Sequence, residues 1–232
     1  MGLYISASGI LTAQRRNDIT AHNVANMRTT GFRASRANSV ETATGGVTLG
    51  AATRDPAPGG IELTGRPLDV AAADGFFQVT LPDGRTAFTR DGRFGLNANG
   101  EVVTSDGARL DPPIQAPANT TSVTVARDGT VLATVPGQNT PQIIGQIQVA
   151  QFPNPQGLES LGGNLFAATA ASGAPQPAVR PMPVLPGALE MSNVDLTTQT
   201  VNQILDRNML EANVNAFRAQ ADLLGELLNL NG

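Results

Sequence analysis

The sequence predicts an α+β fold, in which helices at the two ends flank an inserted all-β domain of short antiparallel strands. Apolar residues recur every three or four positions at both ends, and Asp-Gly and Asn-Gly pairs divide the middle into short apolar runs. We expect an N-terminal helical arm at 1–32, an extended connector at 33–60, a β-rich domain at 61–186 and a C-terminal helical arm at 187–232.

The first helix is expected to run from Gly2 to Met27. Gly31 follows it, and glycine readily takes the left-handed conformation that closes a helix, while Phe32 anchors the exit. The helix has a seam spaced by alternating steps of four and three, with Leu11 beside it: Leu3, Ala7, Ile10, Gln14, Asn17, Ala21 and Val24. This spacing is typical of a coiled coil.

The last helix keeps the same rhythm, and Asn193 or Asp195 is a candidate N-cap. Its seam contains Leu210, Val214, Phe217, Ala221, Leu224 and Leu228. Two interpretations stay open, because the helices can pack on each other inside one globule or pack with the helices of neighbouring subunits.

The connector mixes Ala, Thr, Gly and Pro, and we expect one short strand in it, around Val47–Leu49. Beyond it lie five turn pairs: Asp83-Gly84, Asp91-Gly92, Asn99-Gly100, Asp106-Gly107 and Asp128-Gly129. Such pairs favour tight hairpins, so they predict a meander with strands at 75–81, 86–90, 101–104, 122–126, 131–134 and 142–152. A proline-rich extended return is expected over 175–186.

Composition excludes several classes of function. The chain has 15% charged residues, no cysteine and a net charge of -4, so it lacks both thiolate ligands and the basic tract of a nucleic-acid-binding protein. Low surface charge favours a protein covered by its neighbours. We expect neither a membrane span nor a cleaved signal peptide, since Arg15 and Arg16 interrupt the first apolar segment.

The sequence lacks the residues and motifs that an enzyme active site usually requires. His22 is the only histidine, and the absence of lysine excludes a phosphate-binding P-loop and a Schiff base. Asp69 with Asp74, or Asp91 with Glu101, would be acid/base pairs, but carboxylates are common in turns. We therefore expect no catalytic residues, no cofactor and no metal.

Four ordered blocks resemble the flagellar rod and hook family of axial proteins. The first joins 21–26 (AHNVAN) to 29–33 (TTGFR), and the second joins 64–71 (TGRPLDVA) to 74–79 (DGFFQV). The third is 87–94 (AFTRDGRF), and the last joins 187–195 (GALEMSNVD) to 211–213 (EAN). The middle of the chain is most similar to distal rod members. The connector is shorter than the distal pattern, and residues 207–210 depart from the usual sequence, so proximal rod or hook-type members remain alternatives.

The resemblance implies a self-assembling structural subunit in the periplasm-spanning rod of the basal body, exported by the flagellar apparatus, with the β-rich domain facing outward. It implies partners among copies of itself, other rod and hook proteins, the export apparatus and surrounding ring proteins. The residues expected in subunit packing are Leu3, Ile10, Leu11, Asn23, Val24, Asn26, Gly31, Phe32, Asn193, Leu210, Val214, Phe217, Leu224 and Leu228.

The alternative from another class is a surface β-domain that binds glycan or protein and stands on a closed coiled-coil oligomer. A cell-wall hydrolase using Asp69, Asp74 and Asp91 is a more distant alternative.

Overall fold

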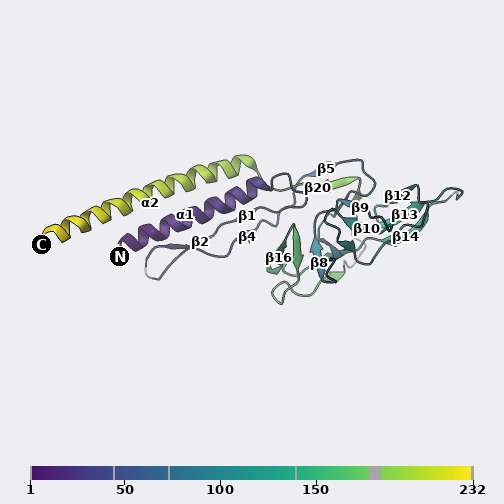
Figure 1. Cartoon of the computed structure of the whole chain (residues 1–232), viewed down its shortest axis with the longest axis horizontal. Helices are drawn as coiled ribbons and strands as arrows, with labels where there is room; N and C mark the ends of the chain where they lie inside the picture. The colour runs from purple at the N-terminus through teal and green to yellow at the C-terminus, as the bar shows by residue number, and fades with distance from the viewer. Residues whose placement is uncertain (1, 44, 73, 139, 178–183, 231–232) are drawn as a thin grey trace. The chain divides into compact units, whose positions relative to one another are not determined.

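The structure of the protein is a computed structural model, which describes residues 2–43, 45–72, 74–138, 140–177 and 184–230, without the side chains of 177, 227, 228 and 230. It confirms the α+β class, with a helix at each end and short antiparallel strands between them (Figure 1). The chain divides into two compact units. The helical unit comprises the described parts of Met1–Met27, Arg33–Pro56 and Val194–Gly232, and the β unit comprises Arg28–Phe32 and the described parts of Ala57–Asn193.

Two long helices dominate the helical unit. Helix α1 spans Gly2–Ala25 and helix α2 spans Leu196–Leu230, and the two run antiparallel side by side. Asp195 caps α2, because its Oδ1 accepts a hydrogen bond from the Thr198 backbone N–H at 2.7 Å. The cap is therefore Asp195 rather than Asn193, and α1 ends two residues before the expected Met27.

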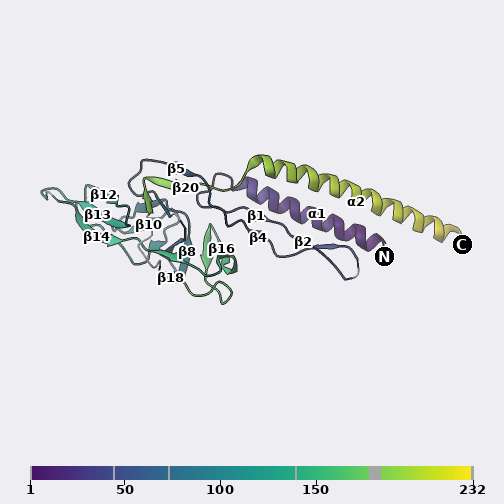
Figure 2. The ribbon, with the colours of Figure 1, turned by 180° about the vertical axis from the view of Figure 1, so that it is seen from behind.

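Two narrow β-ribbons complete the helical unit. Strand β1 (Ser35–Arg36) pairs with β4 (Thr53–Arg54), and β2 (Ser39–Glu41) pairs with β3 (Val47–Leu49). The ribbon β2–β3 lies along α1 (Figure 2), where Thr12 Oγ1 donates to the Val47 carbonyl at 3.1 Å and Val47 N–H donates to Ser8 Oγ at 3.2 Å. The strand expected at Val47–Leu49 is confirmed, but the segment contains four strands rather than one.

The β unit is built on a nine-stranded antiparallel sheet. Its main path is β16 (Glu159–Gly162), β17 (Leu165–Ala167), β8 (Thr86–Thr89), β7 (Phe76–Thr80), β11 (Arg109–Leu110), β10 (Val102–Thr104) and β9 (Phe94–Leu96). Strand β15 (Val149–Gln151) also pairs with β7, and β18 (Gln176–Pro177) pairs with β15.

Three smaller sheets complete the described part of the β unit. They are the three-stranded β12 (Ser122–Val125), β13 (Thr130–Thr134) and β14 (Gln142–Gln146), the pair β6 (Val70–Ala72) with β19 (Val184–Pro186), and the pair β5 (Ile61–Leu63) with β20 (Ala188–Glu190). A single turn of 3₁₀-helix, η1, spans Pro155–Gly157. The proline-rich return is described only at its ends, because residues 178–183 lie outside the described part of the chain.

Four of the five turn pairs make the predicted hairpins. In each, the glycine has a positive φ and its N–H closes the turn: Gly84, Gly100, Gly107 and Gly129. The prediction for Asp91-Gly92 was wrong, because β8 and β9 on either side of it pair with different strands. Gly92 instead serves a close approach, since a Cβ there would lie 1.6 Å from the Val70 carbonyl oxygen.

The strand expected over 142–152 is two strands in different sheets. Strand β14 pairs with β13, whereas β15 pairs with β7, and the chain crosses between the sheets at Ile147. Ile147 is buried, and its N–H donates to the Gly129 carbonyl at 2.8 Å. The apolar run is continuous because both strands and the crossover are partly buried.

Two apolar clusters fill opposite faces of β7. Phe77 belongs to the larger cluster and packs edge-to-face on Phe94, with ring centroids 5.1 Å apart. Phe76 belongs to the second cluster, against Phe152 and Phe166. Successive side chains of a strand point to opposite faces, so the two phenylalanines of this pair contribute to different apolar clusters.

Candidate assembly interface

The two helices meet along a seam of small and polar residues. On α1 the buried and half-buried seam positions are separated by alternating steps of four and three: Gly2, Ser6, Gly9, Ala13, Arg16, Thr20 and Asn23. This is the expected heptad rhythm displaced by one residue toward the N-terminus. The seam inside the chain is therefore not the apolar one that the sequence pattern predicted.

Four cross-helix layers recur every seven residues along this seam. They pair Gly2 with Gln220, Gly9 with Asn213, Arg16 with Asp206, and Asn23 with Gln199. Each step of seven along α1 is matched by a step of seven backward along α2, as an antiparallel coiled coil requires.

The glycine layers are tight. A Cβ on Gly9 would lie 2.4 Å from Asn213 Oδ1, and one on Gly2 would lie 2.8 Å from Gln220 Oε1. Small residues on α1 face long polar side chains on α2, so the two helix surfaces have complementary shapes.

The other two layers are polar on both sides. Arg16 Nε donates to Asp206 Oδ1 at 2.6 Å, with the Arg16 side chain 26% exposed and the Asp206 side chain 1% exposed. Asn23 Nδ2 donates to Gln199 Oε1 at 3.1 Å and to the Ser35 carbonyl at 2.8 Å, and Asn23 Oδ1 accepts from Ser35 N–H. Asn23 thus uses both of its amide hydrogens and its carbonyl oxygen within its own unit.

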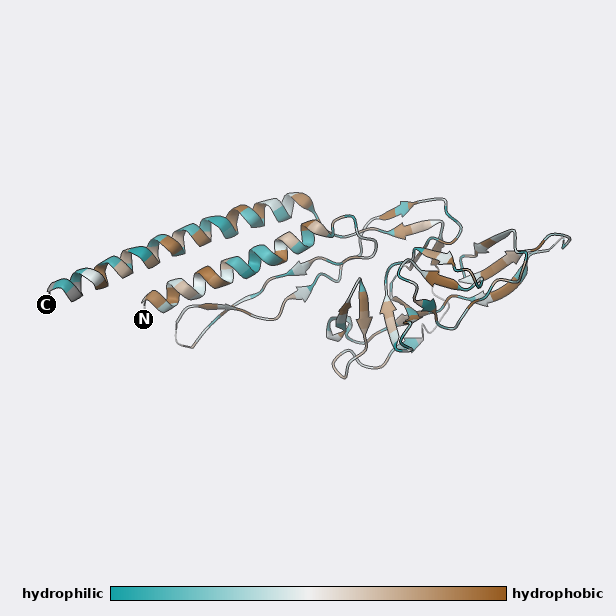
Figure 3. Cartoon of the chain, in the orientation of Figure 1, coloured by the Kyte–Doolittle hydropathy of each residue, from teal (hydrophilic) through white to brown (hydrophobic). Residues whose placement is uncertain are grey.

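Large apolar side chains lie outside the seam and are exposed. Figure 3 shows apolar residues recurring along both helices. We define the assembly surface as the exposed members of this set: Tyr4, Ile5 and Leu11 on α1, and Leu196, Val201, Ile204, Leu205, Met209, Phe217, Leu223 and Leu224 on α2. Leu11 and Ile204 are each 56% exposed. Since Gly2 faces Gln220, the end of α2 continues past α1 and carries Leu223 and Leu224 beyond the pair.

The residues expected in subunit packing fall into distinct groups. Leu3, Ile10 and Val24 on α1, and Leu210 and Val214 on α2, are half-buried beside the seam. Leu11, Phe217 and Leu224 belong to the assembly surface, whereas the side chain of Leu228 lies outside the described part of the chain. Asn26 is half-buried, and its Nδ2 donates to the carbonyl of His22, four residues earlier in the chain.

Gly31, Phe32 and Asn193 come together within the β unit. Gly31 N–H donates to the Glu190 carbonyl at 2.7 Å, and Asn193 N–H donates to the Phe32 carbonyl at 3.3 Å. Asn193 Nδ2 donates to the Ala57 carbonyl at 2.8 Å, and Gly59 N–H donates to Glu190 Oε1 at 3.0 Å. These bonds join three passes of the chain, which we call the three-pass junction (28–32, 57–60 and 187–193).

Sequence reasoning missed Arg16, Gln199 and Asp206. A charged residue inside a helix pattern usually marks the solvated face, so these positions were not assigned to a seam. The signal was nevertheless present, since residues 2, 9, 16 and 23 and residues 199, 206, 213 and 220 are all small or polar at intervals of seven.

The carboxylates considered for catalysis are engaged by arginines or lie alone. Asp91 binds Arg93 at 2.8 Å, and this hydrogen bond raises the pKa of Arg93. Hydrogen bonds from Asn97 and then Arg109 lower the pKa of Glu101, which is the opposite of what a general acid needs. The buried Asp69 lies 3.7 Å from Arg66.

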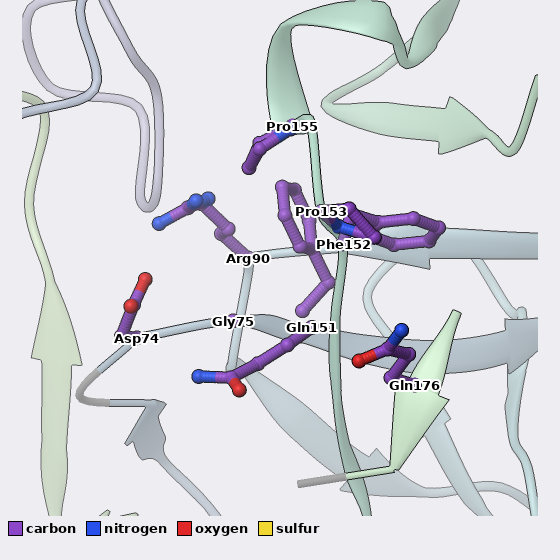
Figure 4. Close-up of a pocket in the computed structure, with 9 residues that line it drawn as sticks. Asp74, Gly75, Arg90, Gln151, Phe152, Pro153, Pro155 and Gln176 are labelled. Carbon is purple, nitrogen blue, oxygen red and sulfur yellow. The ribbon is translucent and has the colours of Figure 1, made fainter. Parts of the chain in front are cut away.

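A shallow pocket of the β unit contains the remaining carboxylate, Asp74 (Figure 4). Arg90 lies over the Phe76 ring there, 4.3 Å from its centroid. Asp74 has no second carboxylate among the lining residues, so the pocket does not form an acid/base pair. Within the described ranges, no three His, Cys, Asp or Glu side chains are grouped to hold a metal ion. No described helix has the length and apolarity to cross a membrane.

A paired-helix unit that leaves this many large apolar side chains exposed belongs to the class of structural subunits whose helices are covered in an assembly. Comparison with family models narrows this class. Residues 3–33 match the flagella basal body rod protein model, residues 72–133 match the FlgE/F/G D1 domain of flagellar hook protein, and residues 185–230 match the C-terminal model of flagellar basal body rod FlgEFG protein.

Individual relatives extend the match to nearly the whole chain. The flagellar basal-body rod protein FlgG of Buchnera aphidicola (Acyrthosiphon pisum) is 37% identical, with 98% of both chains covered. That of Caulobacter vibrioides is 37% identical over 91% of this chain and 92% of the relative. The flagellar hook protein FlgE of Salmonella typhimurium is 36% identical, but the match covers only 49% of this chain and 29% of the FlgE chain. The chain belongs to the flagellar rod and hook protein family, and it is most similar to the distal rod protein FlgG.

Proposed function

We propose that the chain is a structural axial subunit of the bacterial flagellar basal-body rod, which assembles into a helical tube by packing its assembly surface against the helices of neighbouring copies. The observation that carries this proposal is the exposed apolar surface of a helix pair whose own seam is small and polar. Burying such side chains is worth roughly 1.5–3 kcal/mol for each large residue, which a monomer forgoes. Family membership supports the same role.

The shape of the helical unit supports an open assembly. The part of α2 after Gln220, which carries the exposed Leu223 and Leu224, overhangs the described part of α1. A neighbour displaced along the helix axis covers such an overhang and exposes its own, which is a head-to-tail contact that repeats without closing.

The finer features of the role are part of the proposal. Its partners are copies of itself and other rod and hook proteins, with the export apparatus and ring proteins as further contacts. Its location is the periplasm-spanning rod, reached without a cleaved signal peptide. The β-rich domain faces outward, and the chain has no catalytic activity. Family membership supports each of these, and the division into two arms, a connector and an outer β domain belongs to the same proposal.

Polymerisation of point variants tests the proposal. Ile204→Ser and Leu205→Ser remove exposed apolar side chains of α2. Gln203→Ser is the matched control, because it shortens an exposed polar side chain of the same helix. Sedimentation over a range of concentrations and electron microscopy should show filaments for the unchanged chain and Gln203→Ser, and monomers for the two apolar variants.

Two outcomes contradict the proposal. Equal filament formation by all variants would mean that the assembly surface is not the contact. A closed oligomer of fixed mass at every concentration would favour the alternative of a surface β-domain on a coiled-coil stalk.

A further inference from the structure

The polar seam of the helix pair contains one ion pair at its middle. Asp206 has its side chain 1% exposed, and the cation that compensates it is Arg16, on the other helix. A buried polar or charged layer in a coiled coil can reduce stability while it fixes the register and the choice of partner. The arrangement therefore suits a role in specificity.

We propose that Arg16 and Asp206 determine which helices pair, by selecting an α1 helix with an α2 helix in one antiparallel register. This inference deepens the proposed function and rests on it, because other subunits bring competing α1 and α2 helices close only in an assembly. The large apolar side chains are then left for contacts between subunits.

Slipped registers lose the ion pair. A shift of one heptad in one direction places Asp206 opposite Gly9 and Arg16 opposite Gln199. A shift in the other direction places Asp206 opposite Asn23 and Arg16 opposite Asn213. Either slip leaves a carboxylate in the seam without a cation, which is strongly unfavourable for a buried charge.

Parallel, in-register pairs of identical helices are disfavoured as well. Two parallel α1 helices in register would oppose Arg16 with Arg16, and two α2 helices would oppose Asp206 with Asp206. Two α1 helices would also bring Gly2 and Gly9 against glycines, leaving gaps where Gln220 and Asn213 now pack.

Engineered disulfides can report the register, because the chain has no cysteine of its own. A Cβ on Gly9 would lie 2.6 Å from Asn213 Cγ, which places the two Cβ atoms at most about 4 Å apart and thus within reach of a disulfide. Gly9→Cys with Asn213→Cys therefore reports the native register. Gly2→Cys with Asn213→Cys, and Gly9→Cys with Gln220→Cys, report the two registers slipped by one heptad.

The three reporters are tested in four versions of the full chain. These are the unchanged chain, Arg16→Asp, the apolar replacement Arg16→Met with Asp206→Leu, and the control Arg207→Met with Glu211→Leu. The control removes an exposed ion pair of α2 whose side chains are 78% and 58% exposed. Disulfide yield is measured on monomers at low concentration, so the result does not depend on polymerisation.

The unchanged chain and the control should form only the native disulfide, within the chain. Arg16→Asp should lower the native yield by roughly tenfold or more, since it places two carboxylates together in the seam. The apolar replacement should keep the helices paired, as circular dichroism at 222 nm would show, but should also form slipped disulfides, which the unchanged chain does not form.

A native-only pattern in the apolar replacement would overturn the inference, because the register would then be set without the ion pair. If the unchanged chain formed no filaments while the four versions gave the expected disulfide patterns, the result would instead count against the proposed function alone. The two proposals are thus separable.

Discussion

The backbone at Gly59 lies so close to Met191 that a Cβ on Gly59 would be 1.9 Å from the Met191 carbonyl oxygen. The adjacent bonds hold the two segments together, with Met191 N–H donating to the Gly60 carbonyl at 2.8 Å and Gly59 N–H donating to Glu190 Oε1 at 3.0 Å. The three-pass junction therefore depends on glycine at one position for steric reasons.

Gly59→Ala should lower the free energy of unfolding by roughly 1–3 kcal/mol, because the backbone must separate to admit the methyl group. Gly60→Ala is the matched control, since a Cβ there meets nothing within 4 Å. Urea unfolding followed by circular dichroism would measure both. Equal midpoints for the two variants would show that the junction tolerates a side chain at 59.

Phe77→Ala should lower the free energy of unfolding by about 3–5 kcal/mol, because it empties the middle of the larger apolar cluster. Phe77 is fully buried, whereas Leu63 is 83% exposed. Leu63→Ala should therefore change the free energy of unfolding by less than about 0.5 kcal/mol. Thermal unfolding of both variants gives the comparison, and a small effect of Phe77→Ala would contradict the core assignment.

Asn23→Ala should destabilise the helical unit by about 1–3 kcal/mol, since it leaves the buried Gln199 side chain and the Ser35 backbone without these hydrogen bonds. Asn17→Ala, at an exposed position of the same helix, is the control. Urea unfolding monitored at 222 nm measures the loss of helix. If both variants unfolded alike, Asn23 would have no structural role at the seam.

Acid should weaken the N-terminus of α2. Hydrogen bonds from the Thr198 side chain and then its backbone N–H lower the pKa of Asp195 below its usual range. A folded-state pKa below the unfolded one means that the cap stabilises the helix above the unfolded pKa and loses this effect as pH falls through the folded pKa.

Asp195→Asn keeps a capping side chain but does not titrate, so it isolates this contribution from those of the other carboxylates. The difference in thermal stability between the unchanged chain and Asp195→Asn should be constant near neutral pH and should shift against the unchanged chain in acid. A difference that is the same at every pH would show that Asp195 does not act through its charge.

Local chemistry made much of the β unit predictable. Asp-Gly and Asn-Gly pairs specify hairpins because glycine adopts positive φ without steric cost, and four of five pairs behaved accordingly. Asp91-Gly92 did not, because its glycine is needed for the close approach of the Val70 carbonyl, and Val70 is distant in sequence. The split between β14 and β15 was missed for a similar reason, since two successive strands that both contain apolar residues resemble one apolar run in the sequence.

The heptad rhythm of both helices could also be predicted from the sequence. The face of each helix that is buried within the chain could not. Apolar periodicity indicates which side chains avoid water without naming what covers them. It pointed to Leu3, Ile10 and Val24, whereas the helices meet one residue earlier, at Gly2, Gly9 and Asn23. Arg16 and Asp206, which the apolar pattern assigned to no seam, form an ion pair across it.

The sequence by itself determined the α+β class, the terminal helices, most hairpin turns and the flagellar rod and hook family, because each depends on residues close together in the chain or on motifs in a fixed order. The tertiary structure decided which face of each helix pairs within the chain. That choice depends on the fit of Gly9 to Asn213 and on charge neutralisation between Arg16 and Asp206, which are 190 residues apart. No local pattern contains such a match, since it exists only once the two helices are side by side.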